Sequence, residues 1–204
     1  MKILAFTDSH GNTKVLRDMK QRIVKENIKV VICAGDFTIF QENMKYILKK
    51  ISEFKIPVLL VHGNHEDAPD VKHECEKYSN LIFLHEKSYK INNTLILGYG
   101  GGGFSLTGAK FKKVSKSFLK KIEKEKKNNK HLKIVLFTHG PAYRTELDII
   151  MEEHCGSKSI RDFIKQVKPE LHICGHLHEN EGIKDKIGST LTVNPGPYGE
   201  IFEV

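Results

Sequence analysis

The 204-residue sequence contains no apolar run that approaches the ~20 residues of a membrane-spanning helix. Its first residues, MKILAFTDSH, pass from Met1 directly into an expected core strand, without the apolar segment and small-residue cleavage site of a secretory signal. These absences lead us to expect a cytoplasmic chain with no membrane association. Linkers, internal repeats and low-complexity tracts are also missing, so we expect a single domain spanning residues 1–204.

The four cysteines are far apart in the sequence and form no CxxC pair. This spacing argues against a structural zinc ribbon and favours reduced thiols in a cytosolic compartment. Cys33 and Cys174 fall in apolar, strand-like runs, so we expect both to be buried. The apolar content of 39% is ordinary for a globular protein.

The formal net charge of +8 comes mostly from lysines, many of which lie in residues 109–131. Val114, Phe118, Leu119 and Ile122 recur there at helical spacing, which predicts an amphipathic helix whose lysines face solvent. The alternative is a surface for nucleic acid or an acidic substrate. The segment lacks an interleaved aromatic platform and has few arginines, so nucleic acid is not the favoured partner.

Short apolar runs alternate with amphipathic helical patterns along most of the chain, which predicts an α/β domain. We expect strands at residues 3–7, 30–34, 58–61, 81–84, 94–100, 133–138 and 171–174, and helices around 13–26, 41–53, 68–78, 114–128 and 157–167. Residues 182–204 differ, because Gly, Asn and Pro turns separate short strands. There we expect hairpins that join a second sheet.

Polar residues directly follow several of the expected strands. They are Asp8, His10, Asp36, Asn64, His65, His139, His176 and His178. Ligands of open α/β sheets bind in the crevice outside the carboxyl ends of the strands. We therefore expect these side chains, which come from loops far apart in sequence, to converge on one site.

The segment HICGHLHEN contains three of the histidines. His176 and His178 are spaced i, i+2, so on an extended segment both project to the same side and can enter one site. Gly175 is expected to adopt a backbone conformation closed to other residues and to allow another group to approach closely. Histidines that merely cap a strand are the alternative. His172 is expected to lie in the core or to support the site from behind.

The predicted site has more donor groups than one metal ion needs. Its mixture of carboxylate, amide and imidazole suits first-row divalent ions, with Mn, Fe, Co, Ni and Zn all acceptable. We therefore expect two divalent metal ions. A central carboxylate can bridge them, and a shared water would lose its proton near neutral pH to become a nucleophile.

Five short motifs occur in a fixed order: Asp8-x-His10, Gly35-Asp36, Gly63-Asn64-His65-Glu66, His139 and Gly175-His176-x-His178. Together they resemble the motifs of the calcineurin-like metallophosphoesterases. The segments THGPAYRTELD, HCGSKSIRDFI and VNPG are similar to the compact prokaryotic, especially archaeal, branch related to the Icc-type phosphoesterases. The resemblance implies an αββα sandwich of two mixed sheets flanked by helices, with a binuclear site at its rim.

The resemblance also implies a role for each motif residue. One metal would be held by Asp8, His10, Asp36 and His178, and the other by Asp36, Asn64, His139 and His176, with Asp36 as the bridge. The implied reaction is hydrolysis of a phosphate mono- or diester by in-line attack of a metal-bridging hydroxide. His65 would protonate the leaving oxygen, or would only orient the groups around it, and Glu66 would support the ligands.

Several assignments concern the substrate, expected to be a phosphorylated small molecule or a nucleotide. Arg144 and His154 are candidates for binding it, the latter beside the backbone N–H groups of Gly156 and Ser157. The glycine-rich residues 98–105 are either a loop close to the substrate or an ordinary connection. His62, His73, His85 and His131 are assigned no role. A nuclease, a cyclic-nucleotide phosphodiesterase and a non-catalytic scaffold that kept the fold are the alternative functions.

Overall fold

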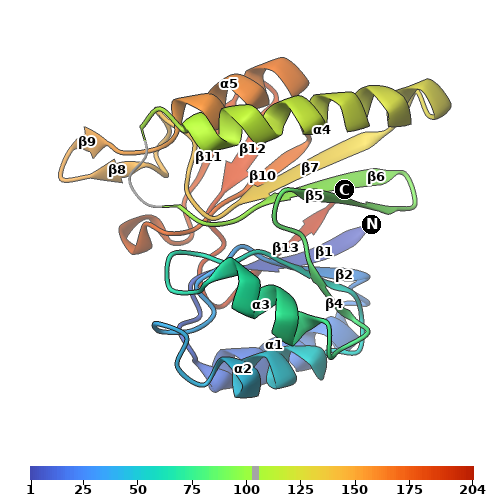
Figure 1. The fold of residues 1–204 in the computed structure, drawn as a ribbon, viewed down its shortest axis with the longest axis vertical. Helices are drawn as coiled ribbons and strands as arrows, with labels where there is room; N and C mark the ends of the chain where they lie inside the picture. Colours follow the sequence, from blue (N-terminus) through green and yellow to red (C-terminus); the bar gives the residue numbers. More distant parts are fainter. Residues whose placement is uncertain (103–105) are drawn as a thin grey trace.

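Two β-sheets face one another and helices cover both outer faces in the computed structural model of the protein, which describes residues 1–102 and 106–204 (Figure 1). The first sheet has the order β13 (Glu200–Glu203), β1 (Lys2–Phe6), β2 (Val30–Cys33), β3 (Val58–Leu60) and β4 (Leu81–Phe83). Strands β1 to β4 are parallel and β13 is antiparallel to β1.

The second sheet has the order β11 (Lys184–Ile187), β12 (Thr190–Val193), β10 (Leu171–Ile173), β7 (Lys133–Thr138), β6 (Thr94–Tyr99) and β5 (Lys87–Ile91). Its four central strands are parallel, and the edge strands β11 and β5 are antiparallel to their neighbours. The αββα sandwich implied by the motifs is thus confirmed.

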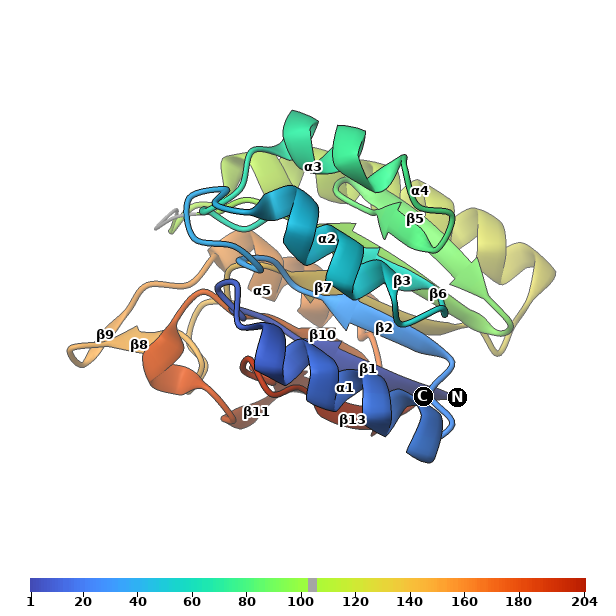
Figure 2. The ribbon, with the colours of Figure 1, turned by 90° about the horizontal axis from the view of Figure 1, so that it is seen from below.

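Three helices cover the first sheet: α1 (Thr13–Lys25), α2 (Met44–Ser52) and α3 (Ala68–Cys75) (Figure 2). Two cover the second, α4 (Ala109–Asn128) and α5 (Lys158–Val167). A short ribbon of β8 (Ile149–Ile150) and β9 (Glu153–His154) extends beyond the sheets, and a 3-10 turn, η1, spans His178–Asn180. No helix in the described part of the chain is both long and apolar enough to cross a membrane.

Strand alternation separates the core into layers. Ile3 and Ala5 of β1 pack between the two sheets, whereas Leu4 and Phe6 point to the opposite face and pack under the helices of the first sheet. Every one of these residues is fully buried. Both faces of the sheet are therefore apolar, and polar side chains of these strands are confined to their ends.

The lysine-rich segment forms a helix as predicted, but α4 begins at Ala109 rather than at residue 114. Its buried residues Phe111, Phe118 and Ile122 belong to the cluster under α4 and α5, and its lysines lie on the remaining surface. The first turn escaped prediction because it has no acidic residue and no side-chain cap, the usual signals of a helix start.

Three further features differ from the expectation. The C-terminal hairpin of β11 and β12 joins the second sheet, but β13 crosses back and pairs with β1. Strand β5, an edge strand with the half-exposed sequence KSYKI, was not predicted, because it lacks a continuous apolar run. The same is true of the two-residue strands β8 and β9.

Candidate metal centre

The predicted ligands converge at the carboxyl ends of strands from both sheets. They form two groups whose ligand atoms lie within 4.8 Å of one another: Asp8, His10 and His178, and Asp36, His139 and His176. Asp8 and His10 follow β1, Asp36 follows β2, His139 follows β7, and His176 and His178 follow β10. The motifs imply two ligand sets that contain these residues, with Asp36 shared between them and Asn64 added to the second.

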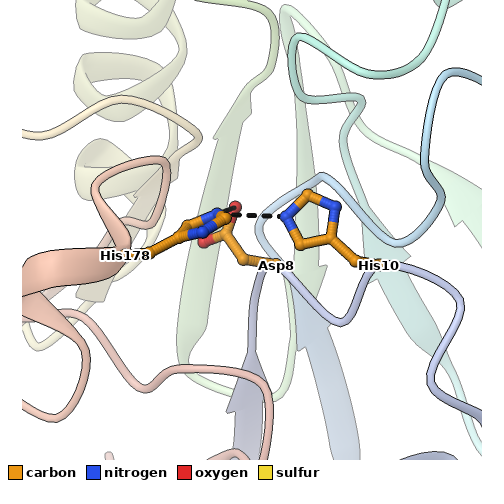
Figure 3. A group of neighbouring side chains, drawn as sticks. All are labelled: Asp8, His10 and His178. Atoms are coloured by element: carbon orange, nitrogen blue, oxygen red, sulfur yellow. Dashed lines mark hydrogen bonds and ion pairs between the residues drawn. The ribbon is translucent and has the colours of Figure 1, made fainter.

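The first group brings together two residues near the start of the chain, Asp8 and His10, and one from much later in the sequence, His178. The Nε2 atoms of His10 and His178 lie 3.0 Å apart, and His178 Nε2 lies 3.7 Å from Asp8 Oδ1 (Figure 3). His10 Nδ1 lies 3.1 Å from the carbonyl oxygen of Thr38, which can only accept, so this nitrogen donates. Neutral His10 therefore presents a lone pair at Nε2, the arrangement typical of a metal-binding imidazole.

Asp8 presents one satisfied and one unsatisfied oxygen. Its Oδ2 accepts hydrogen bonds from Thr7 Oγ1 at 2.8 Å and from the backbone N–H of His176 at 3.0 Å. Its buried Oδ1 has no hydrogen-bond partner among the described residues. Because a buried carboxylate oxygen without a hydrogen bond is costly, this atom fits a bound cation. The donor set of this group therefore suits a divalent metal ion.

The second group is built around His139, which is fully buried. Its Nδ1 donates to the carbonyl oxygen of Ala34 at 2.9 Å, so Nε2 faces the site. That Nε2 lies 3.4 Å from Asp36 Oδ2 and 2.9 Å from Asn64 Oδ1. Asn64 Oδ1 also lies 2.7 Å from His176 Nδ1, so the amide oxygen of Asn64 is directed into this group.

Electrostatic coupling between Asp36 and His139 is strong. Burial raises the pKa of Asp36, but the hydrogen bond and positive charge of His139 outweigh it and hold that pKa at about 2. Burial lowers the pKa of His139, yet the hydrogen bond and charge of Asp36 outweigh it and raise that pKa to about 9. Without a metal, a proton on His139 therefore neutralises Asp36.

The other imidazoles differ in protonation. Burial lowers the pKa of His10, and it lowers the pKa of His176 to about 4. Both rings are therefore neutral near pH 7, the form that binds metal. The neighbouring carboxylate of Asp8 raises the pKa of His178, with burial opposing the shift.

Glu66 ties together the loops that follow β2 and β3. Its buried carboxylate accepts hydrogen bonds from the backbone N–H groups of Asp36, Thr38 and Gly63 at 3.0, 2.8 and 2.9 Å. A fourth comes from Thr38 Oγ1 at 2.7 Å. Burial raises the pKa of this carboxyl. Glu66 thus holds the backbone of Asp36 and the turn that leads to Asn64 in one arrangement.

The backbone around the site is strained. Asp8, His10, Asp36 and His176 have φ values of 51°, 42°, 48° and 74°, in the left-handed region that residues with a Cβ rarely adopt. Such conformations cluster at functional sites, where the surrounding structure enforces them.

Two properties were expected of Gly175, a close approach by another group and a special backbone conformation, and only the first is found. A Cβ at this position would lie 2.0 Å from Thr7 Oγ1 and 2.4 Å from Asp8 Oδ2, so the close approach is real. The expected special conformation is wrong, because the positive φ belongs to the next residue, His176, and not to Gly175. His172, as expected, is fully buried, with hydrogen bonds to Thr138 Oγ1 at 2.9 Å and Thr192 Oγ1 at 2.7 Å.

His65 lies beside both groups. Its Nε2 is 3.9 Å from Asp36 Oδ2, and its ring centroid is 4.9 Å from that of His10. Its Nδ1 accepts a hydrogen bond of 3.2 Å from the backbone N–H of Phe40. Neutral His65 therefore has its proton on Nε2, the nitrogen nearer to Asp36.

Arg144 and His154, the proposed substrate-binding residues, both contact Asp148. The Arg144 backbone N–H donates to Asp148 Oδ2 at 3.0 Å, and His154 Nδ1 lies 2.8 Å from Asp148 Oδ1. The backbone N–H groups of Gly156 and Ser157 are occupied by Asp148 and Pro141. Ser157 caps α5, its hydroxyl accepting from the backbone N–H of Ile160. The structure does not bring Arg144 or His154 into either metal group.

Two histidines that received no role from the sequence lie next to the site. His62 and His85 line a cavity of about 670 Å³ that also touches the metal-group residue His176. His62 lies two residues beyond β3 and His85 two residues beyond β4. A position just after a strand was the available signal, and it is the same signal that identified the ligands.

Comparison with known proteins agrees with the fold and the motifs. The sequence pattern of the calcineurin-like phosphoesterase family matches residues 1–180. An uncharacterised protein of Methanocaldococcus jannaschii is 32% identical over 204 residues, covering 97% of this chain and 88% of that protein. A probable glycerophosphodiester phosphodiesterase of Arcobacter nitrofigilis is 26% identical over 165 residues, which are 76% of this chain and 58% of that protein.

Solved structures share the fold at low sequence identity. A Thermus thermophilus protein superposes with a TM-score of 0.76 at 19% identity, covering 97% of this chain and 89% of the other. A dimetal phosphatase from Danio rerio superposes with a TM-score of 0.64 at 10% identity, covering 95% and 86%. With the family pattern matched over most of its length, this chain belongs to the calcineurin-like phosphoesterase family and is a metal-dependent phosphoric ester hydrolase.

Proposed function

We propose that this protein hydrolyses phosphate mono- or diesters at a centre of two divalent metal ions. The main support is the convergence of His10 Nε2, His178 Nε2 and Asp8 Oδ1, an oxygen that accepts no hydrogen bond from the described residues, next to a second group of donors around His139. In this proposal Asp8, His10 and His178 hold one ion, and Asn64, His139 and His176 hold the other. Asp36 bridges the two.

Bound divalent ions would neutralise the phosphoryl oxygens and supply a deprotonated water as nucleophile near neutral pH. Mn, Fe, Co, Ni and Zn all suit this mixture of imidazole, carboxylate and amide ligands. The Danio rerio protein of similar fold is a dimetal phosphatase, which supports two ions rather than one.

The protein side chains supply binding, orientation and a proton. His65 is proposed to protonate the leaving oxygen through Nε2, which lies on the side of Asp36. To act as an acid, His65 must carry protons on both nitrogens, and this form gives up the hydrogen bond that Nδ1 accepts from Phe40. Glu66 holds the Asp36 backbone and the Gly63 turn in fixed positions through its hydrogen bonds to both.

In this proposal residues 1–204 form one domain, and the protein is cytoplasmic. The four free cysteines support the cytoplasmic location. Its substrate is a phosphorylated small molecule or a nucleotide. The probable glycerophosphodiester phosphodiesterase among the relatives supports esters of small alcohols. A non-catalytic scaffold would not need His65 in addition to every proposed ligand.

The test is an assay of the metal-loaded protein with 4-nitrophenyl phosphate and bis(4-nitrophenyl) phosphate, with each candidate metal in turn. We expect hydrolysis of at least one ester, lost when the metals are chelated and restored when they are returned. A His139→Gln variant serves as the matched control, since it removes one proposed ligand. Full metal loading without hydrolysis of either ester would favour the scaffold. Cyclic nucleotides and single-stranded oligonucleotides in the same assay test the two remaining alternatives.

A further inference from the structure

A cavity lies against the second metal group. Its volume is about 670 Å³, within the usual range for organic ligands and far above the needs of a phosphate group. It is lined by residues of the loops after β3, β4 and β6, by the first turns of α4 and α5, and by Gly140 and His176. Gly140 follows His139, so a group in the cavity would adjoin the proposed metal held by His139 and His176.

One wall of the cavity is a continuous row of rings. The ring centroids of His62 and His85 lie 4.5 Å apart, and those of His85 and Tyr99 lie 5.4 Å apart. Tyr99 continues the row to Phe111, with centroids 5.0 Å apart. The His85 and Tyr99 rings are inclined to each other by 34°, whereas His62 meets His85 and Tyr99 meets Phe111 edge to face, at 76° and 79°. Another planar ring in the cavity can pack against this row by tilted stacking or by an edge-to-face contact.

The row is held in place by the glycine-rich loop. His85 Nδ1 accepts from the backbone N–H of Gly100 at 2.9 Å, and its Nε2 lies 3.5 Å from Glu86 Oε1. A Cβ on Gly100 would lie 2.5 Å from the carbonyl oxygen of His62, and one on Gly101 would lie 2.8 Å from His62 Nε2. The absence of side chains at these glycines therefore lets the loop close over His62. Residues 103–105 of the glycine-rich segment lie outside the described part of the chain.

A second, smaller cavity lies beside the other metal group. Its volume is about 210 Å³, and its lining includes His10, Thr13, Glu42 and Tyr46. The two groups are thus flanked by cavities of unequal size, one touching His176 and one touching His10. A phosphomonoester has one organic arm, whereas a diester has two. Unequal cavities on the two sides suit a diester with one bulky and one small arm.

We propose that the cavity walled by His62, His85 and Tyr99 binds an aromatic ester arm of nucleoside size. The preferred substrate is then a phosphodiester with a nucleoside-like arm in this cavity and a small alcohol on the His10 side. This inference rests on the proposed function for its reaction, but the binding of the aromatic group does not require metal ions.

The test compares two diesters that share a methyl ester and differ only in the other arm. They are the methyl ester of adenosine 5′-monophosphate and ethyl methyl phosphate, with hydrolysis followed by ³¹P NMR. Base stacking on aromatic side chains leads us to expect a preference for the adenosine ester of roughly 5- to 100-fold in kcat/KM. Ala109→Trp places a large ring at an exposed position of the cavity wall and should abolish that preference. Lys116→Trp, on an exposed position of the same helix, should keep it.

A second measurement is independent of catalysis. Saturation-transfer-difference NMR with adenosine and metal-free protein should show transfer to the base protons, lost in Ala109→Trp and weakened in His85→Ala. Equal hydrolysis of both diesters by the wild type would overturn the cavity assignment and leave the proposed function standing. Adenosine binding that depends on Ala109, with neither diester hydrolysed, would support the cavity and contradict the proposed function. Unchanged adenosine binding in a folded Ala109→Trp variant would overturn the inference.

Discussion

His10 and His178 face each other through their Nε2 atoms at 3.0 Å, although 168 positions separate them in the chain. Because His10 Nδ1 donates to Thr38, the His10 Nε2 brings a lone pair to this contact. In the metal-free protein, a proton on His178 Nε2 can satisfy this lone pair, and the neighbouring Asp8 carboxylate raises the pKa of His178. A metal ion near Asp8 would replace that proton and use both nitrogens.

If Asp36 bridges two ions, Asp36→Asn should reduce occupancy of both, because a neutral amide is a poor ligand between two cations. Elemental analysis of the purified and reconstituted variant should give clearly fewer than two equivalents per chain. The controls Asp8→Asn and His139→Gln each remove a ligand proposed for one ion only and should retain about one equivalent. Two full equivalents in Asp36→Asn would remove Asp36 from the bridging role.

Metal binding should release a proton from His139 at neutral pH. The pKa of His139 is raised from 6.5 to about 9 in the folded protein, so the ring is protonated at pH 7.5 and must lose that proton to bind metal. Calorimetric titrations in buffers of different ionisation enthalpy measure the number of protons released. We expect fewer protons from His139→Gln than from the wild type, and equal release would contradict the assignment.

The same shift predicts the pH dependence of the metal-free protein. A raised folded pKa contributes stability that is fully present below pH 6.5 and is lost as the pH rises through about 9. The lowered pKa of Asp36 contributes stability above pH 3.8 that is lost as the pH falls through about 2. The free energy of unfolding should therefore fall between pH 6.5 and 9 relative to His139→Gln, as measured by urea unfolding. A parallel profile in the two proteins would argue against the Asp36–His139 pair.

Gly175→Ala should displace Asp8, because the added Cβ would lie 2.4 Å from Asp8 Oδ2 and 2.0 Å from Thr7 Oγ1. Overpacking of this kind costs about 1–3 kcal/mol of stability, and we expect the ion near Asp8 to be lost as well. Gly140→Ala is the matched control, since it lies next to His139 but its Cβ would meet nothing within 4 Å. Urea unfolding and metal analysis of both variants provide the check. Full metal content in a folded Gly175→Ala would show that the contact is not needed.

The acid role of His65 can be tested through the leaving group. A proton donor matters most when the departing oxygen is a basic alkoxide and little when it is a nitrophenolate. His65→Ala should therefore lose a factor of about 10² to 10⁴ on alkyl esters and markedly less on nitrophenyl esters. Metal content must be measured in parallel. Equal slowing of both esters with both metals retained would show that His65 only positions other groups.

The lysine face of α4 should not bind nucleic acid. Glu125 pairs with Lys90 at 2.7 Å and with Lys121 at 2.9 Å, so part of the positive charge is already neutralised within the protein. Electrophoretic mobility shifts with single-stranded and duplex oligonucleotides should show no tight association at physiological salt. Tight, strongly salt-dependent binding that is lost when Lys120, Lys121 and Lys124 are changed to Gln would contradict this interpretation.

The sequence by itself determined most elements of the fold and the membership of the proposed site. Apolar runs flanked by turn signals identified the central strands, and helical periodicity identified the helices α1 to α5, because both patterns depend only on neighbouring residues along the chain. The candidate ligands were recognisable for a similar reason: each directly follows an apolar run and shares a short motif with its neighbours. Parallel strands place such residues at one sheet edge regardless of the details of packing.

Only the tertiary structure decided which distant segments touch. The local pattern of β13 suits either sheet, and its pairing with β1 follows from the packing of the whole sandwich. Arg144 and His154 are ten positions apart in the sequence, and only the folded chain shows that both contact Asp148. The ring row of His62 and His85 arises because the loops after three strands and the start of α4 meet at one place. Contacts of this kind depend on how two sheets and their covering helices pack together, a property that no local periodicity encodes.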